Sequence, residues 1–134
     1  MKHLLFLMFS GTLLISACDS KPQTEGQNEE ALNLKDIELP EALEMMKQSD
    51  IITIDIRTPE EIAQGKMLES ALEMDFYADD YKNKLSALDK EAKYVIYCRS
   101  GGRSGKTLKM MKDMGFKNAY NVLGGYNAYK EMKE

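Results

Sequence analysis

Residues 98–104 are the part of the chain whose side chains are best suited to chemistry. They read Cys-Arg-Ser-Gly-Gly-Arg-Ser and lie between an apolar run, residues 94–97, and a segment with helical periodicity, residues 106–114. This pattern predicts a thiol, Cys98, at the mouth of a loop that joins a β-strand to an α-helix.

Two features of this loop favour a thiolate. Gly101 and Gly102 allow a tight turn with inward N–H groups, and the helix that follows adds the positive end of its dipole. Arg99 and Arg103 add two positive charges, which should lower the pKa of a thiol from its free value of about 8.5. Cys98 is therefore predicted to be a nucleophile, although most single cysteines are small buried side chains.

The composition limits how this thiol could be activated. The chain has 134 residues, enough for one domain, and its net charge of −4 offers no basic footprint for nucleic acid. The single histidine, His3, lies in the N-terminal leader, so the mature domain can hold no Ser-His-Asp triad, Cys-His dyad or histidine zinc site. No metal and no cofactor are expected, and loop dipoles and arginines must activate Cys98.

The N-terminus predicts export. Residues 1–17 begin with a positive charge at Lys2, continue with an apolar run and end in small residues, as a signal peptide does. The order Ile-Ser-Ala-Cys at residues 15–18 resembles the bacterial lipobox, in which the cysteine is lipidated and becomes the new N-terminus. The alternative is an ordinary secretory signal that is cleaved after Ala17. The lipobox is preferred because Cys18 directly follows the small residues, and it predicts a periplasmic domain anchored by lipid to a bacterial membrane.

The lipidated cysteine would be followed by a tether and then by the folded domain. Residues 19–30 contain no large apolar side chain, so residues 18–31 are predicted to be a disordered tether and residues 32–134 the domain. With Cys18 lipidated, Cys98 is the only free thiol and no intramolecular disulfide can form. A solitary thiol in an oxidising compartment needs a chemical reason, which supports a catalytic Cys98.

Strand-like and helix-like segments alternate along the domain, which predicts a parallel sheet covered by helices on both faces. Ligands of such sheets bind outside the carboxyl ends of the strands, where Asp55 and Cys98 are both expected. Thr58 begins a helix, with Glu61 as its partner in a capping box. The expected strands are residues 34–39, 51–55, 71–76, 94–97 and 119–123. One helix is expected to begin at Pro40, and four others are expected over residues 58–64, 79–89, 106–114 and 126–132.

Three motifs follow one another along the domain. They are Asp-Ile-Arg-Thr-Pro-Glu-Glu at residues 55–61, the cysteine loop at residues 98–104 and Gly-Gly-Tyr at residues 124–126. With them the chain resembles a single-domain rhodanese, a sulfurtransferase, over roughly residues 34–134. The resemblance implies a three-layer α/β/α fold whose five-stranded parallel sheet has the strand order 3-2-4-5-1. It also implies that Cys98 carries a persulfide, while the following residues bind the substrate through backbone N–H groups and two arginine side chains: Arg99, Ser100, Gly101, Gly102, Arg103 and Ser104.

The chemistry expected of this site is transfer of a sulfane sulfur. A small anionic donor such as thiosulfate would load Cys98, and a thiol or a protein acceptor would then take the sulfur, without a cofactor. The alternative is a tethered persulfide carrier or redox-sensing module without rapid turnover, because it needs the same loop.

The chain departs from the family pattern at two places. Residues 65–71 keep little of the usual Gly-His-Ile and Gly-Ala and are one residue longer, and Tyr126 replaces the usual tryptophan. Asp55 and Arg57 are interpreted as a strand-end acid and base that tie loops together, in preference to groups that transfer protons.

Two other enzyme classes fit part of the loop. Residues 100–107 differ from the phosphate-binding pattern G-x-x-x-x-G-K-T only at the first position. That pattern leaves Cys98 unexplained, and the domain is small for a nucleotide-hydrolysing fold. Cysteine phosphatases also place an arginine after the nucleophile, but with one residue more than the four, residues 99–102, that intervene here. The shorter loop favours a sulfur atom over a phosphate.

Overall fold

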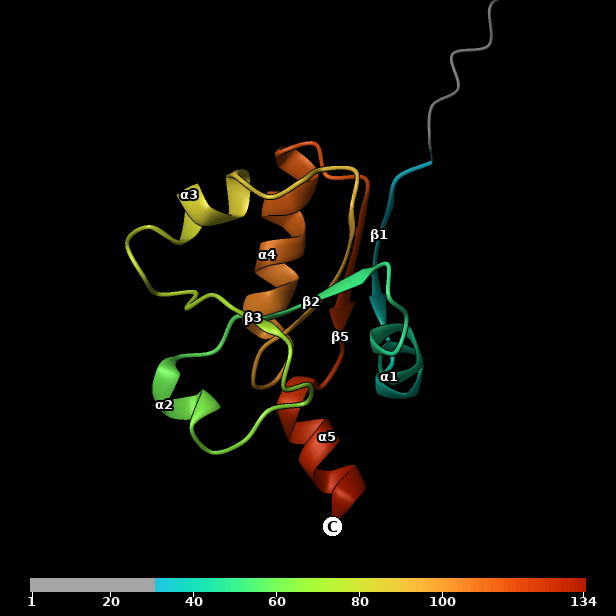
Figure 1. The fold of residues 1–134 in the computed structure, drawn as a ribbon, viewed down its shortest axis with the longest axis vertical. Coiled ribbons are helices and arrows are strands. Elements are labelled where there is room, and N and C mark those ends of the chain that lie inside the picture. The colour runs from blue at the N-terminus through green and yellow to red at the C-terminus, as the bar shows by residue number, and fades with distance from the viewer. Residues whose placement is uncertain (1–30) are drawn as a thin grey trace, which may run out of the picture.

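The computed structural model describes residues 31–134 (Figure 1). The predicted signal peptide, residues 1–17, the predicted lipidation site Cys18 and the tether up to residue 30 lie outside the described residues. Within the described residues, no helix is long and apolar enough to cross a membrane.

Strands and helices alternate without exception, as predicted. The strands are β1 (Asn33–Ile37), β2 (Ile51–Asp55), β3 (Leu72–Glu73), β4 (Lys93–Tyr97) and β5 (Asn118–Val122). The helices are α1 (Leu39–Met46), α2 (Pro59–Ile62), α3 (Tyr81–Ser86), α4 (Gly102–Asp113) and α5 (Gly125–Lys133).

The strands form one five-stranded sheet in which every neighbouring pair is parallel. Its order is β1-β5-β4-β2-β3, which is the predicted order 3-2-4-5-1 read from the other edge. β2 and β4 pair along their whole lengths, up to Asp55 opposite Tyr97. The residues that follow β2 and β4 therefore leave the sheet side by side at its carboxyl edge.

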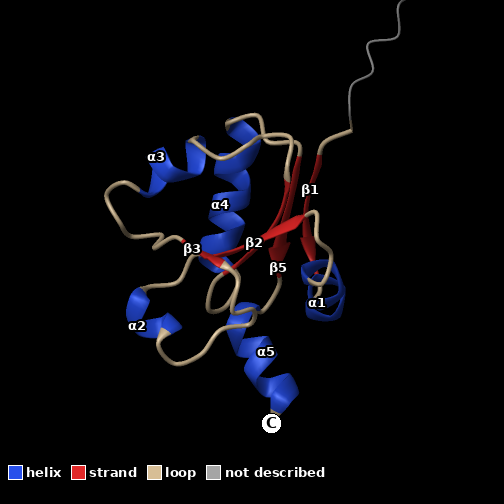
Figure 2. Ribbon diagram, in the orientation of Figure 1, coloured by secondary structure: helices blue, strands red, loops and turns tan. Residues whose placement is uncertain are grey.

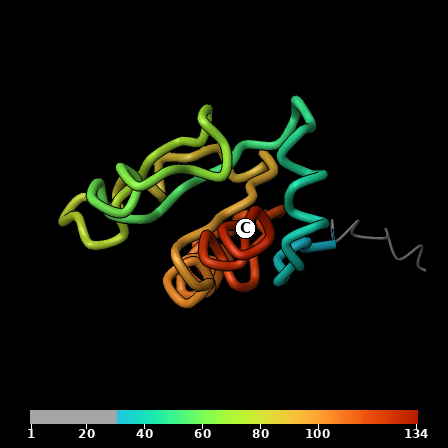
Figure 3. The backbone as a smooth tube through the Cα atoms, turned by 90° about the horizontal axis from the view of Figure 1, so that it is seen from below, coloured from blue at the N-terminus to red at the C-terminus, as the bar shows by residue number. Residues whose placement is uncertain are grey.

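Side chains of the central strand β4 alternate between two cores. Tyr94 and Ile96 belong to the core beneath α3 and α4, whereas Val95 and Tyr97 belong to the core beneath α1 and α5. Successive side chains of a strand point to opposite faces, so one buried strand can supply both cores. The three-layer α/β/α fold is thus confirmed (Figure 2). In the view from below, α1 lies at one side and the segment containing α2 at the other, with α4 and α5 between them (Figure 3).

The third strand is shorter than predicted. A strand was expected over residues 71–76, but only Leu72 and Glu73 pair with β2 in regular register. β2 ends at Asp55, and the following chain bends while Met74 N–H still donates to the Asp55 carbonyl at 2.9 Å. The edge of the sheet therefore continues as irregular backbone that runs toward the cysteine loop.

Two helices are also shorter than predicted. α2 stops at Ile62, and a turn closes it where Gly65 N–H donates to the Ile62 carbonyl at 2.9 Å. α3 spans six residues, and its last turn is followed by a bond from Leu88 N–H to the Leu85 carbonyl at 3.2 Å. Both segments keep hydrogen-bonded turns beyond the helix, which explains why the helical spacing of their apolar residues extends past the end of the helix.

Candidate active site

Cys98 lies at the carboxyl edge of the sheet, directly after β4. The register of β2 with β4 places Asp55, the last residue of β2, opposite Tyr97, the residue that precedes Cys98. The Cys98 side chain is 1% exposed and forms no disulfide. The thiol is therefore enclosed by the loop that follows it.

Two hydrogen bonds reach the sulfur from this loop. Gly101 N–H donates to Cys98 Sγ at 3.1 Å, and the Ser104 hydroxyl donates to it at 3.4 Å. Burial acts to raise the pKa of Cys98, but hydrogen bonds from Ser104 and from the Ser100 and Gly101 amides outweigh it and hold the pKa below its ordinary value. The site thus favours a thiolate, as the loop sequence predicted.

The helix after the loop begins four residues earlier than predicted. α4 starts at Gly102 rather than at Lys106, so Arg103 and Ser104 belong to its first turn. Gly101 precedes the helix with a φ of +96°, a left-handed conformation that favours glycine. The turn points the free N–H groups of the helix terminus at the sulfur, where the helix dipole stabilises negative charge.

The Gly-Gly-Tyr motif, residues 124–126, packs against the backbone of the cysteine loop. Tyr126 N–H and Asn127 N–H, in the first turn of α5, donate to the carbonyls of Cys98 and Arg99 at 2.9 Å each. Gly125 has a φ of +53°, and a Cβ placed on it would lie 2.5 Å from the Cys98 carbonyl oxygen. Only glycine lets α5 approach the backbone of Cys98 this closely. The sequence alone did not indicate this contact.

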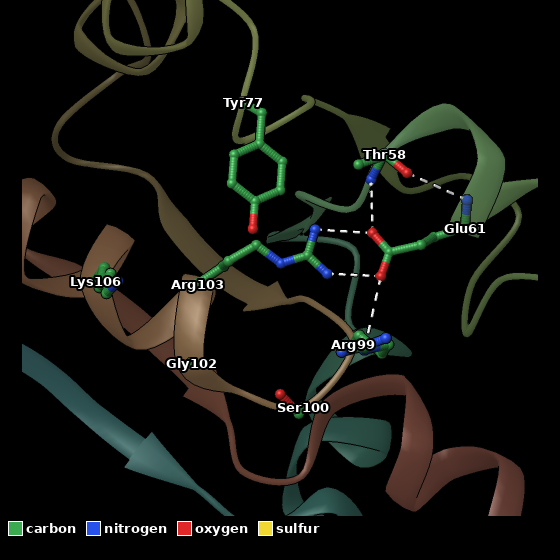
Figure 4. Close-up of a pocket in the computed structure, with 8 residues that line it drawn as sticks. All are labelled: Thr58, Glu61, Tyr77, Arg99, Ser100, Gly102, Arg103 and Lys106. Atoms are coloured by element: carbon green, nitrogen blue, oxygen red, sulfur yellow. Dashed lines mark hydrogen bonds and ion pairs between the residues drawn. The ribbon is translucent and has the colours of Figure 1, made fainter.

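Glu61 was expected only to stabilise the start of α2, but it also binds the cysteine loop. Its carboxylate accepts two hydrogen bonds from Arg103, at 2.7 and 2.8 Å, and Arg99 Nε lies 3.9 Å away (Figure 4). The Arg103 hydrogen bond outweighs the effect of burial and lowers the pKa of Glu61 to about 2. Thr58 N–H also donates to Glu61 at 3.0 Å, so the predicted capping box is confirmed and one carboxylate serves both contacts.

This pairing changes the role expected of the arginines. Both were predicted to lower the pKa of Cys98, but the loop hydrogen bonds are the larger cause. The Cys98 charge does raise the pKa of Arg103, after the stronger effects of Glu61 and burial. Arg99 is 67% exposed and turns toward solvent. The guanidinium groups therefore face the approach to the sulfur rather than the sulfur itself.

A pocket opens beside the loop, with a volume of about 530 Å³. Figure 4 shows Arg103 reaching from α4 to Glu61 across this pocket, beneath the ring of Tyr77. Three of its side chains are cationic and one is acidic, so the pocket favours anions. Its lining residues are Thr58, Glu61, Tyr77, Arg99, Ser100, Gly102, Arg103 and Lys106.

The sequence profile of the family described as rhodanese-like domain matches residues 38–132. This chain belongs to the rhodanese-like family. A sulfurtransferase of Allochromatium vinosum is 38% identical over 80 residues, which are 60% of this chain and 72% of that protein. The thiosulfate sulfurtransferase of Coxiella burnetii is 29% identical over 97 residues, which are 72% of this chain and 87% of that protein. The crystal structure of a rhodanese-like domain protein from Staphylococcus aureus aligns with a TM-score of 0.62 and 29% identity, covering 71% of this chain and 90% of that one.

Behind the cysteine loop, the rhodanese-like domain holds a buried ion pair. Arg57 and Asp55 are 1% and 0% exposed, and Asp55 accepts from Arg57 Nε at 2.9 Å and from Nη2 at 2.7 Å. The guanidinium also donates to the carbonyls of Glu61, at 3.2 Å, and Gly65, at 2.7 Å. The ring of Tyr126 covers it at 4.0 Å, in the place expected for an aromatic side chain. These contacts join β2, α2 and α5, and neither charged group touches Cys98 Sγ.

The donor set of the rhodanese-like domain contains no cluster suited to a metal. Among residues 31–134, no three side chains of His, Cys, Asp or Glu lie close enough together to hold an ion. The groups that the site does offer for chemistry are the thiol, the loop amides and the cationic pocket.

Proposed function

We propose that this rhodanese-like protein transfers a sulfane sulfur from an anionic donor such as thiosulfate, through a persulfide on Cys98. The observation that carries the proposal is the sulfur held by Gly101 N–H and the Ser104 hydroxyl next to a cationic pocket. A buried thiol whose pKa is nevertheless lowered is suited to nucleophilic attack. The names of the Allochromatium and Coxiella relatives support the reaction class and the donor, respectively.

The first half-reaction loads the cysteine. The Cys98 thiolate attacks the outer sulfur of thiosulfate, the S–S bond of the donor breaks, and its electron pair leaves with sulfite. The persulfide anion is then stabilised by the same preorganised donors, Gly101 N–H and the Ser104 hydroxyl, that held the thiolate.

The second half-reaction unloads the cysteine. An acceptor thiol gives its proton to the outer sulfur of the persulfide anion, its thiolate then attacks that sulfur, and the electron pair of the S–S bond returns to Cys98 Sγ. The acceptor leaves as its own persulfide, which keeps the proton, and the Cys98 thiolate is restored. Donor and acceptor thus use one pocket in turn, which predicts ping-pong kinetics.

The phosphate-binding alternative is disfavoured by the position of Thr107. Its hydroxyl is fully buried, lies 2.6 Å from the hydroxyl of Tyr81 and donates to the Arg103 carbonyl at 3.0 Å. A nucleotide-binding loop needs this hydroxyl for the magnesium ion of its substrate. In this domain the same hydroxyl fixes the first turn of α4.

A tethered persulfide carrier is the second candidate, and one observation favours it. Cys98 is only 1% exposed, so the thiolate reacts only with groups that enter the loop. A carrier would be loaded slowly by thiosulfate and would pass its sulfur rapidly to a protein thiol. The two functions are separated by comparing these rates on the same protein.

We further propose that the domain is exported and anchored through lipidated Cys18, with the domain in the periplasm. The support is the order Ile-Ser-Ala-Cys at residues 15–18 after an apolar leader. Metabolic labelling with a fatty acid should mark the wild type and leave a Cys18→Ala variant unlabelled. Label on both proteins, or on neither, would contradict the anchor.

The sulfurtransferase proposal is tested by sulfite release. The full chain, incubated with thiosulfate and a small thiol acceptor, should release sulfite over many turnovers, and Cys98→Ser should release none. A Cys18→Ser variant is the matched control, because Cys18 is the other cysteine of the chain. Equal release by wild type and Cys98→Ser would overturn the proposed mechanism.

A further inference from the structure

The outer face of α4 carries a strip of lysines that the reaction does not use. Lys106, Lys109 and Lys112 recur every third residue, and all three are exposed. No ion pair joins any of them to a carboxylate within residues 31–134. We call these three residues the basic strip.

The basic strip stands out against the rest of the protein. α4 carries Arg103 and the three lysines against a single acid, Asp113, whereas the whole chain has a net charge of −4. On the other face of the sheet, α1 carries Glu41 and Glu44 and has no basic residue in its last turn. α4 therefore concentrates positive charge on one side of an acidic protein.

The strip leads into the candidate active site. Lys106 lines the pocket together with Arg99 and Arg103, while Lys109 and Lys112 continue along the helix away from it. Tyr77 stands at the pocket rim, 67% exposed, with its ring 5.5 Å from the Arg103 guanidinium. An exposed tyrosine beside an arginine is a pair that commonly anchors a protein partner, and exposed lysines next to it attract an acidic partner over a longer distance.

We infer that the sulfur acceptor is a protein whose thiol lies in an acidic surface, and that this surface docks along the basic strip of α4. The inference rests on the proposed sulfurtransferase function and names the class of its acceptor. Opposite charges on the two surfaces would steer the acceptor and align its thiol with the pocket.

The pocket favours such an acceptor over a small thiol or a lipid. Three of its side chains are cationic and one is acidic, so an acidic surface is attracted to its mouth. The pocket adjoins the cysteine loop, because Ser100, Gly102 and Arg103 line it, and Lys106 joins it to the basic strip. An anionic membrane could bind the lysines, but its headgroups bring no thiol to the persulfide.

The docked step conserves atoms and electrons. The acceptor thiolate attacks the outer sulfur of Cys98-S-SH, and a new S–S bond forms on the acceptor. The bond between Cys98 Sγ and the outer sulfur breaks, with its electron pair on Sγ. The proton stays on the transferred sulfur, so one thiolate is consumed and one is formed.

The test compares two charge-reversal variants of the full chain, both carrying Cys18→Ser so that Cys98 is the only thiol. Lys109→Glu with Lys112→Glu reverses the part of the strip outside the pocket. Lys35→Glu with Lys47→Glu makes the same change in net charge elsewhere and disrupts two exposed ion pairs and the contact of Lys35 with the Tyr120 ring. The probes are a peptide with one cysteine among aspartates and a matched peptide with asparagines in their place. Transfer is followed by the mass of each peptide after mixing with protein preloaded by thiosulfate.

The expected result is faster transfer to the acidic peptide than to the neutral one, by about tenfold at low salt. Lys109→Glu with Lys112→Glu should remove that advantage, while the control variant and unloading by 2-mercaptoethanol stay as in wild type. Added salt should also erase the advantage, because it screens exposed charges. Equal transfer to both peptides, or equal loss in both variants, would overturn the inference.

Binding is measured in parallel so that the surface is tested even without sulfur transfer. A fluorescent acidic peptide with serine in place of cysteine should bind the wild type and the Lys35, Lys47 variant, and should bind the Lys109, Lys112 variant less tightly. If no persulfide forms but this pattern appears, the sulfurtransferase proposal fails and the docking surface stands. If vesicles containing phosphatidylglycerol bind through Lys109 and Lys112 while the peptide does not, the partner is a membrane and the inference is wrong.

Discussion

Removing the carboxylate of Asp55 is expected to destabilise the domain strongly while leaving the chemistry of Cys98 in place. Asp55 is fully buried and accepts hydrogen bonds from the Nε, Nη2 and backbone N–H of Arg57. In an Asp55→Ala variant the guanidinium would keep only the carbonyls of Glu61 and Gly65 as acceptors. A positive charge would then remain buried without a counter-charge.

The size of the effect follows from this burial. Breaking a buried ion pair by removing one partner costs about 3–5 kcal/mol, whereas replacing both partners by apolar side chains is often nearly neutral. A domain of this size has a free energy of unfolding of about 5–15 kcal/mol. Asp55→Ala should therefore remove a large fraction of the stability. The double variant Asp55→Leu with Arg57→Met should lose much less stability than the sum of the losses in the single variants Asp55→Leu and Arg57→Met.

The assay is urea unfolding followed by far-UV circular dichroism, with the two single variants and the double variant forming a thermodynamic cycle. Persulfide formation is measured on the folded fraction of each variant, and it should persist because neither side chain touches Cys98 Sγ. A cost below about 1 kcal/mol for Asp55→Ala would be typical of an exposed pair and would refute the reasoning. Full stability with lost persulfide formation would also refute it, by making Asp55 catalytic.

Three further changes test the packing and charges of the loop. Gly125→Ala places a methyl group against the Cys98 carbonyl and should lower the free energy of unfolding, measured by urea titration, by about 1–3 kcal/mol. Because the methyl group also displaces the cysteine loop, sulfite release should slow by about 100-fold. The Glu61 pKa of about 2, below its ordinary 4.5, means that its ion pair with Arg103 stabilises the fold above pH 4.5 and that this contribution is lost as the pH falls toward 2. Glu61→Gln should therefore lower the urea midpoint at pH 7 and flatten the pH dependence of that midpoint between pH 4.5 and 2. A pH dependence equal to that of the wild type would contradict the ion pair between Glu61 and Arg103. Alkylation of Cys98 by iodoacetamide should reach half its maximal rate below the free-thiol pKa of about 8.5, and Ser104→Ala should shift the profile to higher pH. An unshifted profile would mean that the hydroxyl does not stabilise the thiolate.

The central features of the fold could be predicted because they depend on local patterns. The β-branched run at residues 51–55 became β2 over the same residues. Thr58 and Glu61, three residues apart, made the capping box that their side chains predict. The cysteine loop carries its glycines next to the thiol in the sequence, so inward N–H groups could be anticipated, whereas the hydrogen bond from the Ser104 hydroxyl was not.

The contacts that were missed all join segments far apart in the chain. Glu61 binds Arg103 across 42 residues, and nothing in a capping pattern indicates a second partner. The need for glycine at Gly125 depends on the backbone of Cys98, which reaches it only through the folded sheet. α4 began earlier than its apolar periodicity suggested, because its first turn is polar and is held by long-range contacts such as the ion pair of Arg103 with Glu61.

The central claim is the persulfide on Cys98, and the intact mass of the protein tests it most directly. The full chain is incubated with thiosulfate, freed of excess reagent without reductant, and weighed beside its Cys98→Ser variant. The wild type should gain the mass of one sulfur atom, which a thiol reductant then removes, and the variant should gain nothing. An unchanged wild-type mass, or the same gain on the variant, would contradict the account.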